Sequence, residues 1–490
     1  MFAFAFVGFL ARVGGFSFSG SPGQPATRVN LFFKFDPLIA AASTLSGHAF
    51  YRGLLWWLVV LIPTLFLGRL FCGWVCPMGS LNQFLSSICP RSKKKRIVSN
   101  RYKKWQMMKY FLLIAGVAAA LFRSGIIAWI DPFCLLIRSA GISILPAAAS
   151  KKYFAVYQPH YWMSLLSILL FLALLAMNVR VTRFWCRALC PLGALLGLTA
   201  RWSILRLHKN PTSCNQCKAC LIDCQGGDDP IAGAEWHKAE CHLCLNCVEA
   251  CPHGSLQFQF FSSESEVAQT NLGRRKALAA AGAGLVAVPL LRAGSALGNS
   301  RNELLIRPPG ALAEQAFLSR CIRCGECMRV CPNDALQPTL AEAGLMGLWS
   351  PVVVPKIGYC EPDCVLCSEV CPTSAIENLT TLQKGWTVTD SAAVAPMRIG
   401  MAAYDRKLCL PWAKATDCVV CLEWCPVEPK AIYVKEAEID DGEGKLRKLK
   451  QPYLDTNRCV GCGACEFACP LQDHPGVYVT GIGENRSRRD

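Results

Sequence analysis

Six runs of four cysteines constrain the fold of this chain more than any other feature of its sequence. Cys214 to Cys224 and Cys241 to Cys251 both have the spacing CxxCxxCxxxC. In bacterial ferredoxins with such runs, three neighbouring thiolates hold one four-iron cluster and the fourth cysteine crosses to a second cluster. A zinc site uses pairs of cysteines, and a disulfide framework would not keep repeating such triplets. The spacing therefore predicts ferredoxin-like domains.

Four further runs begin at Cys321, Cys360, Cys409 and Cys459. The second of these widens the first gap by one residue, and the third widens it much further. Pairing neighbouring runs by the crossing rule predicts six 4Fe-4S clusters, whose iron is bound by 24 cysteines. We number the expected ligand sets in chain order: set 1 is Cys214, Cys217, Cys220 and Cys251; set 2 is Cys241, Cys244, Cys247 and Cys224; set 3 is Cys321, Cys324, Cys327 and Cys371; set 4 is Cys360, Cys364, Cys367 and Cys331; set 5 is Cys409, Cys418, Cys421 and Cys469; set 6 is Cys459, Cys462, Cys465 and Cys425.

Four more cysteines lie in two copies of one CxxxCP motif. RLFCGWVCPMGSL (69–81) and RFWCRALCPLGAL (183–195) match at the arginine, both cysteines, the proline, the glycine and the last leucine. An Asp-Pro pair lies upstream of each copy, so we interpret the region as an internal parallel repeat. Its symmetry would bring together Cys72, Cys76, Cys186 and Cys190. These thiols could bind a further cluster or another thiophilic metal, cycle as redox dithiols, or pack as small buried side chains.

The upstream acids are Asp36 and Asp131, each followed by proline. Many helices begin with aspartate as the N-cap and proline next, so capping is the first interpretation. A second interpretation is that the two carboxylates accept protons from a quinol.

Composition and hydropathy predict that part of the chain lies in a membrane. Hydrophobic residues make up 52% of the chain and charged residues 17%, and three apolar stretches (54–71, 110–130 and 161–178) have the character of spans, with 1–10 as a short fourth. The net charge of +17 could indicate nucleic acid. However, the basic residues crowd loops beside apolar stretches, as in 91–109, which favours solvated cytoplasmic loops and no nucleic acid partner.

A doubled arginine divides the cysteine runs into two groups. Arg274 and Arg275 precede the apolar stretch 277–291, which is the layout of a twin-arginine export signal, although a basic helix start on an alanine-rich linker is the alternative. The sequence thus predicts an α-helical membrane domain of about four spans with an internal parallel repeat, one twin-arginine-type anchor helix, and α+β bacterial ferredoxin-like domains. The expected domains are a membrane domain with two CxxxCP motifs (1–207), a cytoplasmic two-cluster ferredoxin domain (208–262), a transmembrane anchor (271–292) and a four-cluster periplasmic ferredoxin domain (300–490).

No catalytic signature accompanies the cysteines: the sequence has no GxGxxG after a strand, no Walker loop and no defensible Ser/His/Asp grouping. The CxxxCP region with the first two runs resembles the NapH-type subunit of periplasmic nitrate reductase systems and is similar to NosR-type and CcoG-type proteins. The chain from Arg274 onward resembles the NapG-type exported ferredoxin in its twin arginines, its four runs and the long gap from Cys409 to Cys418. The chain therefore resembles a fusion of the two families.

The resemblance implies a quinol dehydrogenase-type module at a bacterial inner membrane. It would take electrons from the quinone pool and deliver them to a periplasmic reductase or cytochrome c, with the C-terminal ferredoxin domain in the periplasm. Two alternatives remain open at this point. One is a metal or cofactor maturation factor that acts through the CxxxCP thiols, as the CcoG resemblance suggests. The other is a cytoplasmic polyferredoxin docked on a membrane anchor.

Overall fold

The computed structural model describes residues 33–48, 52–88, 91–144, 164–261, 272–296, 303–340, 342–386, 396–440 and 446–485. These residues fall into two compact units. The first contains the described residues of Arg28–Ala140 and Leu165–Pro289, and the second contains those of Gly141–Ser164 and Leu290–Asp490. Each unit is described by itself below.

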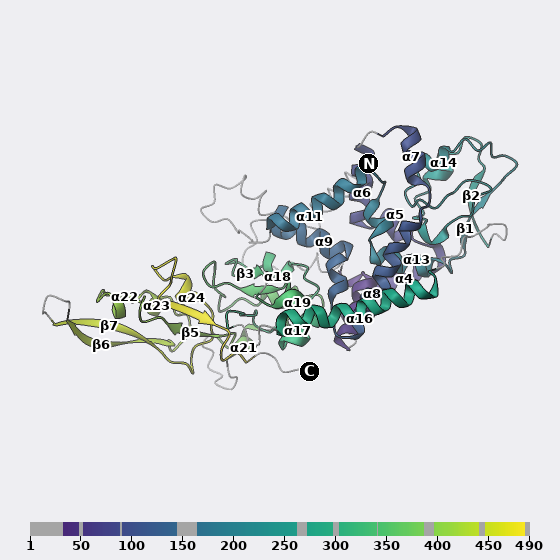
Figure 1. Cartoon of the computed structure of the whole chain (residues 1–490). Helices are drawn as coiled ribbons and strands as arrows, with labels where there is room; N and C mark the ends of the chain where they lie inside the picture. Colours follow the sequence, from purple (N-terminus) through teal and green to yellow (C-terminus); the bar gives the residue numbers. More distant parts are fainter. Residues whose placement is uncertain are drawn as a thin grey trace. The chain divides into compact units, whose positions relative to one another are not determined.

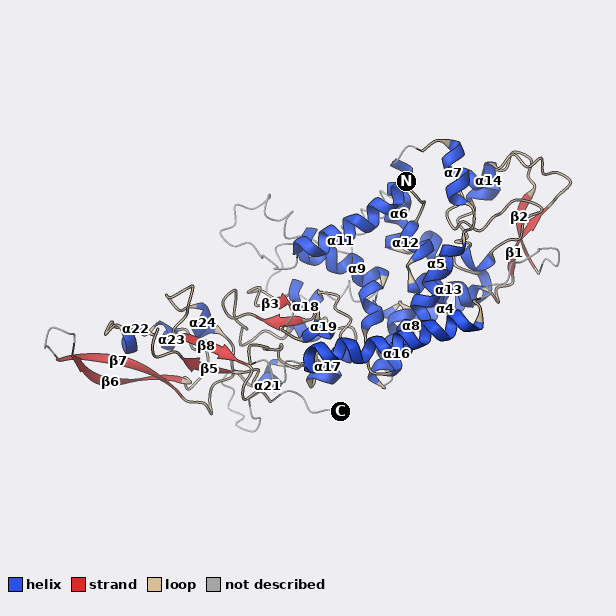
Figure 2. Ribbon diagram, viewed as in Figure 1, coloured by secondary structure: helices blue, strands red, loops and turns tan. Residues whose placement is uncertain are grey.

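The first unit is mostly helical, with one small sheet (Figures 1 and 2). Its long apolar helices surround a core that includes Met78, Tyr110, Phe133, Leu192 and Leu196. Its elements are α3 (Pro37–Gly47), α4 (Leu58–Leu67), α5 (Leu70–Trp74), α6 (Pro77–Ile88), α7 (Lys93–Asn100), α8 (Met108–Leu121), α9 (Pro132–Ser139), α11 (Ser164–Ala176), α12 (Phe184–Ala188), α13 (Pro191–Ala200), β1 (Leu205–Lys209), α14 (Ala219–Ile222), α15 (Asn246–Glu249), β2 (Leu256–Phe260) and α16 (Arg274–Ala296).

The expected membrane spans are contradicted. Within the described ranges, no helix combines the length and the hydropathy that a membrane crossing requires. A crossing takes about 20 consecutive apolar residues, whereas α4 has 10 residues, α8 has 14 and α11 has 13. This finding corrects the predicted membrane domain of about four spans, the twin-arginine-type anchor and the placement in a bacterial inner membrane. The short apolar stretch 1–10 lies outside the described residues.

Helix ends interrupt the apolar stretches that the hydropathy pattern predicted as continuous spans. Stretch 54–71 ends its helix α4 at Gly68, whose φ of 107° no helical residue adopts, and continues as the separate helix α5. Stretch 110–130 leaves its helix α8 at Phe122 and turns through Arg123 at a φ of 58°. The expected anchor does form the helix α16, but its described part begins with three basic residues and then contains more alanine and glycine than leucine.

The ferredoxin-like part of the first unit packs directly on the repeat. Strands β1 and β2 pair antiparallel, and a small core forms around Leu207, Trp236 and Leu256. Gly73 of α5 lies against the backbone of the loop between Cys241 and Cys244, because a Cβ on this glycine would be 2.3 Å from the His242 carbonyl oxygen. The CxxxCP motifs and the first two cysteine runs therefore belong to one compact unit.

The second unit consists of short elements around the remaining four runs. Its three small sheets are all antiparallel pairs, β3 with β4, β5 with β8 and β6 with β7. The longest is the β6–β7 hairpin, drawn in red in Figure 2. Its elements are α17 (Glu314–Arg320), α18 (Glu326–Arg329), β3 (Leu336–Pro338), α19 (Gly344–Gly347), β4 (Pro351–Val353), α20 (Leu366–Glu369), α21 (Thr381–Lys384), β5 (Met401–Tyr404), α22 (Leu410–Ala413), α23 (Val420–Glu423), β6 (Ile432–Asp440), β7 (Leu446–Leu454), α24 (Ala464–Phe467) and β8 (Val477–Thr480).

The packing of α16 on α8 can be tested with two glycines of one helix. A Cβ on Gly284 would lie 2.2 Å from the Ala115 carbonyl oxygen, whereas a Cβ on Gly282 would meet nothing within 4 Å. We expect Gly284→Ala to destabilise the protein by about 1–3 kcal/mol, because backbone must move to make room. Gly282→Ala should stabilise it by up to about 1 kcal/mol, because alanine favours the helix. Urea unfolding of both variants measures this difference, and equal effects would contradict the close packing.

Candidate iron-sulfur centres and a four-cysteine site

All six cysteine runs build the same local structure. In each run a four-residue helix begins one residue before the third cysteine. These helices are α14, α15, α18, α20, α23 and α24. The repeated helix places the third thiol of each run in the same local position relative to the first two.

The four runs with standard spacing share a second feature, which is left-handed backbone. In the run from Cys321, for example, Arg323 and Gly325 have φ values of 56° and 83°. The corresponding pairs in the other three are Gln216 and Lys218, Leu243 and Leu245, and Gly461 and Gly463. Alternating left-handed residues turn backbone N–H groups into a concavity that binds anions, including iron-sulfur clusters.

The two runs with widened gaps lack this feature. The residues before their helices, Val365 and Val419, have φ values of −126° and −125°. In a standard run, by contrast, burial raises the pKa of the Cys459 thiol while hydrogen bonds from the N–H groups of Ala402 and Gly461 oppose that rise. The widened gap thus changes which backbone donors reach the sulfur atoms.

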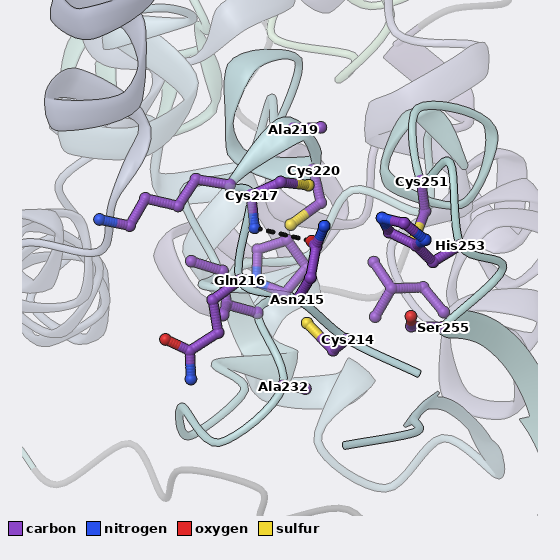
Figure 3. A pocket seen from close by; sticks show the side chains of 14 residues that line it. Cys214, Asn215, Gln216, Cys217, Ala219, Cys220, Ala232, Cys251, His253 and Ser255 are labelled. Carbon is purple, nitrogen blue, oxygen red and sulfur yellow. Dashed lines mark hydrogen bonds between the residues drawn. The ribbon is translucent and has the colours of Figure 1, made fainter. Parts of the chain in front are cut away.

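Four of the six expected ligand sets each surround a cavity. The cavity linings contain all four cysteines of sets 1, 3, 5 and 6, including in each case the cysteine that crosses from the partner run. The empty space is nearly equal in the four, at about 330 to 370 Å³. Figure 3 shows the sulfur atoms of set 1 around one such space, with Cys251 contributed by the other run.

The remaining two sets are also brought together. In set 4, burial raises the pKa of the Cys367 thiol, and Cys360, Cys331 and Cys364 raise it further. In set 2, burial raises the pKa of Cys241, and Asp228, Cys247 and Cys244 add to the rise. Cys224 likewise has its pKa raised by burial, by Asp228 and by Cys244. Such thiols hold their protons in the absence of metal, so iron binding would release protons.

The two CxxxCP motifs meet in the first unit, on α5 with α6 and on α12 with α13. All four cysteines are buried. Burial raises the pKa of Cys190, and the other three thiols, Cys186, Cys72 and Cys76, raise it further. The internal repeat therefore assembles a four-cysteine site, which we define as Cys72, Cys76, Cys186 and Cys190.

A buried network of charged side chains adjoins the four-cysteine site. Glu240 accepts hydrogen bonds from the Lys109 ammonium and from the Tyr110 hydroxyl (2.9 Å). Burial opposes ionisation of Glu240, but Lys109 and Arg69 hold its pKa below the usual value. Lys109 was expected in a solvated basic loop and is instead fully buried. No local signal distinguishes it, because its partner lies 131 residues away in the sequence.

Asp36 and Asp131 both cap helices, at the starts of α3 and α9. Oδ1 of Asp36 accepts from the N–H groups of Leu38 (2.7 Å) and Ile39 (3.3 Å). Oδ1 of Asp131 accepts in the same way from two N–H groups, at 2.9 and 3.0 Å. Both carboxyls are fully buried, and a side-chain hydrogen bond links the two carboxyl groups to each other. Burial raises the pKa of Asp36, and the neighbouring Asp131 raises it further.

Family models for iron-sulfur proteins match several segments of the chain. A 4Fe-4S binding domain matches residues 49–96 and 163–210, which contain the two CxxxCP motifs. A second 4Fe-4S binding domain matches 234–257 and 317–337, and a 4Fe-4S dicluster domain matches 414–472. Together with the geometry of the cysteine runs, these matches define the chain as an iron-sulfur electron-transfer protein of the ferredoxin type.

Relatives identify the family more closely. The methylamine utilization ferredoxin-type protein MauM of Methylobacillus flagellatus is 32% identical over 37% of this chain and 71% of its own length. The ferredoxin-type protein NapG of Escherichia coli is 32% identical over 36% of this chain and 69% of its own length. Protein NirI of Paracoccus denitrificans is 30% identical over 39% of this chain and 26% of its own length. The chain belongs to the MauM and NapG family of ferredoxin-type proteins, which confirms the NapG-type resemblance. No solved structure matches the chain.

Double variants test whether the fourth ligand of each cluster comes from the neighbouring run. Cys327 and Cys371 lie together around one cavity, although they come from different runs, whereas Cys367 and Cys371 come from one run. We expect Cys327→Ala/Cys371→Ala to lose about four iron atoms per chain and Cys367→Ala/Cys371→Ala to lose about eight, since the second double variant damages two clusters. Iron and acid-labile sulfide analysis measures both. The reverse result would show that each run holds its own cluster.

Proposed function

We propose that the chain takes electrons from a quinol and passes them one at a time through six 4Fe-4S clusters to a periplasmic reductase or cytochrome. The observation that carries the proposal is the assembly of six four-thiol sets, each combining three cysteines of one run with one of its partner. Clusters held in this way supply one-electron transfer. The chain carries no catalytic signature beside them, and a protein of this kind does its chemistry at its ends.

The four ligand sets of the second unit are neighbours in the order 3, 4, 6, 5. Cys327 of set 3 is close enough to Cys367 of set 4 for the two thiols to interact electrostatically. Sets 4 and 6 meet where the N–H of Cys360 donates to the carbonyl of Cys462 (2.8 Å). Cys465 of set 6 interacts in turn with Cys421 of set 5. The order 3, 4, 6, 5 supports transfer along one line without branches.

An aromatic cluster lies at the middle junction of this line. Tyr359, Trp424 and Phe467 each stand beside or close to a ligand cysteine of set 4 or set 6 in the sequence. Their ring centroids are 5.4 to 6.1 Å apart. The contact stabilises the junction between the two cluster pairs.

Two features of the first unit support a quinol as the electron donor. Oxidation of a quinol releases two protons, and the buried carboxyl groups of Asp36 and Asp131, which hydrogen-bond to each other, form a pair that can take up one of them. Apolar side chains on the outside of this unit, such as Leu165 (67% exposed) and Leu169 (54% exposed), form a surface that suits an apolar ligand.

The double variant Asp36→Asn/Asp131→Asn tests whether the two aspartates serve quinol oxidation without affecting the clusters themselves. Asparagine keeps the oxygen that caps each helix, so the fold should be retained. We expect reduction of the clusters by a quinol analogue to slow by about 100-fold, which is the loss expected when a proton acceptor is removed. Reduction by dithionite should not change, because it requires no proton acceptor.

The matched control is Asp223→Asn, which removes a partly exposed carboxyl paired with Arg96. Stopped-flow absorbance of the anaerobic holoprotein measures both reductants. Normal quinol-dependent reduction in the double variant would contradict the role of the aspartates. Failure of both reductants would instead point to damage of the clusters.

A further inference from the structure

The two CxxxCP motifs are interlocked by their arginines. The Arg183 guanidinium Nη1 donates to the carbonyl of Cys72 in the other copy (2.9 Å). A Cβ on Gly193 would lie 2.8 Å from Nη2 of Arg69, and a Cβ on Gly79 would lie 3.4 Å from Nη1 of Arg183. Each arginine therefore occupies the space that the glycine of the opposite copy leaves open. The arrangement has approximate twofold symmetry around the four-cysteine site.

Buried charges around this site do not balance. Arg69, Lys109, Arg183 and Arg187 are at most 2% exposed, and all four act electrostatically on His242. The buried carboxylates that act on Arg187 are Glu240 and Asp228. Four cations and two carboxylates leave an excess of two positive charges. Buried charges without partners are costly, so the site calls for an occupant with about two negative charges.

Several polar atoms here are also without partners. Nε of Arg69 and Nε of Arg183 are buried and make no hydrogen bond among the described residues. The same holds for both ring nitrogens of His242, a side chain that is 1% exposed. Arg69 Nη2 already lies 3.9 Å from the Cys72 sulfur. Sulfur atoms of a metal cluster accept hydrogen bonds from such donors, and these bonds tune its potential.

We propose that Cys72, Cys76, Cys186 and Cys190 hold a seventh 4Fe-4S cluster, with Arg69 and Arg183 as its counter-charges. Four thiolates and an oxidised [4Fe-4S]²⁺ core together carry two negative charges, which match the excess. A zinc ion with four thiolates would carry the same charge. However, the family model that covers both motifs is a 4Fe-4S binding domain, which favours the cluster.

The site is in direct contact with set 2 of the ferredoxin-like part. The Trp74 indole N–H, between Cys72 and Cys76, donates to the carbonyl of Leu243 (2.9 Å). In the second copy, Arg187 lies against Gly227, because a Cβ on this glycine would be 2.2 Å from the guanidinium. Both motif copies thus touch loops that carry set 2 ligands. If the proposed function holds, one electron passes between the two clusters; one is oxidised and the other reduced, and no bond is broken.

The count of clusters in the wild-type holoprotein decides the inference. After anaerobic reconstitution of the full chain, we expect about 28 iron atoms and as many acid-labile sulfides per chain, against about 24 for six clusters. A count near 24 would overturn the inference and leave the proposed function in place. Stoichiometric zinc in protein purified from cells, lost in a variant of the four cysteines, would also overturn it.

Variants then locate the seventh cluster. Cys76→Ala/Cys190→Ala should lose about four iron atoms and retain the other six clusters. The control is Cys134→Ala, which also removes a fully buried thiol but lies outside every set. If the double variant keeps all its iron, the assignment is wrong. If it unfolds, the wild-type count still decides.

A redox titration tests whether Arg69 acts as a counter-charge of the cluster. Replacing a buried cation beside a cluster disfavours the extra electron, so Arg69→Gln should shift one cluster to a more negative potential in a redox titration followed by electron paramagnetic resonance. Arg96→Gln, which removes a partly exposed arginine paired with Asp223, should shift none. An unchanged potential in Arg69→Gln would overturn the assignment of Arg69.

Discussion

The second unit depends on what its cysteine runs bind, because most of its elements are too short to be stable alone. Helices of four residues do not form in water without partners, and two-stranded sheets are marginal. The core of the second unit includes cysteines of its own ligand sets, among them Cys321, Cys367 and Cys465. Iron that binds such buried thiols would stabilise the folded chain directly, because the binding free energy adds to the free energy of folding.

The ligand sets stay a prediction that rests on local spacing: spacing fixes three thiols of a run, and the fourth follows from the pairing of neighbouring runs. The structure places the four cysteines of sets 1, 3, 5 and 6 around common cavities. The repeat could also be predicted, since its two copies match residue by residue. Membrane spans were wrongly predicted because hydropathy counts apolar residues and does not see a break such as Gly68 at a φ of 107°. The Lys109–Glu240 pair could not be predicted, because the two residues are far apart in the sequence and only the fold brings them together.

The two copies of the motif differ at positions that meet the ferredoxin-like part. Gly73 and Arg187 occupy equivalent places, each directly after the first cysteine of its copy. Gly73 lets the backbone at His242 approach, while Arg187 reaches backbone carbonyls of Ser99 (3.1 Å) and Arg101 (3.0 Å) and lies against Gly227. The two copies of the motif therefore contact the ferredoxin-like part through different side chains. The arginine, both cysteines, the proline and the glycine, by contrast, are the same in both copies.

The widened runs change which residues supply the backbone donors of a ligand set. Left-handed residues precede the helices of the standard runs, whereas Val365 and Val419 have φ values of −126° and −125°. The sets built on the widened runs still have backbone donors, because the N–H groups of Leu336 and Ala335 act on Cys331 and that of Leu422 acts on Cys421. Hydrogen bonds to sulfur tune the potential of a cluster. Runs of unequal spacing are therefore a means by which one chain can give similar ligand sets different potentials.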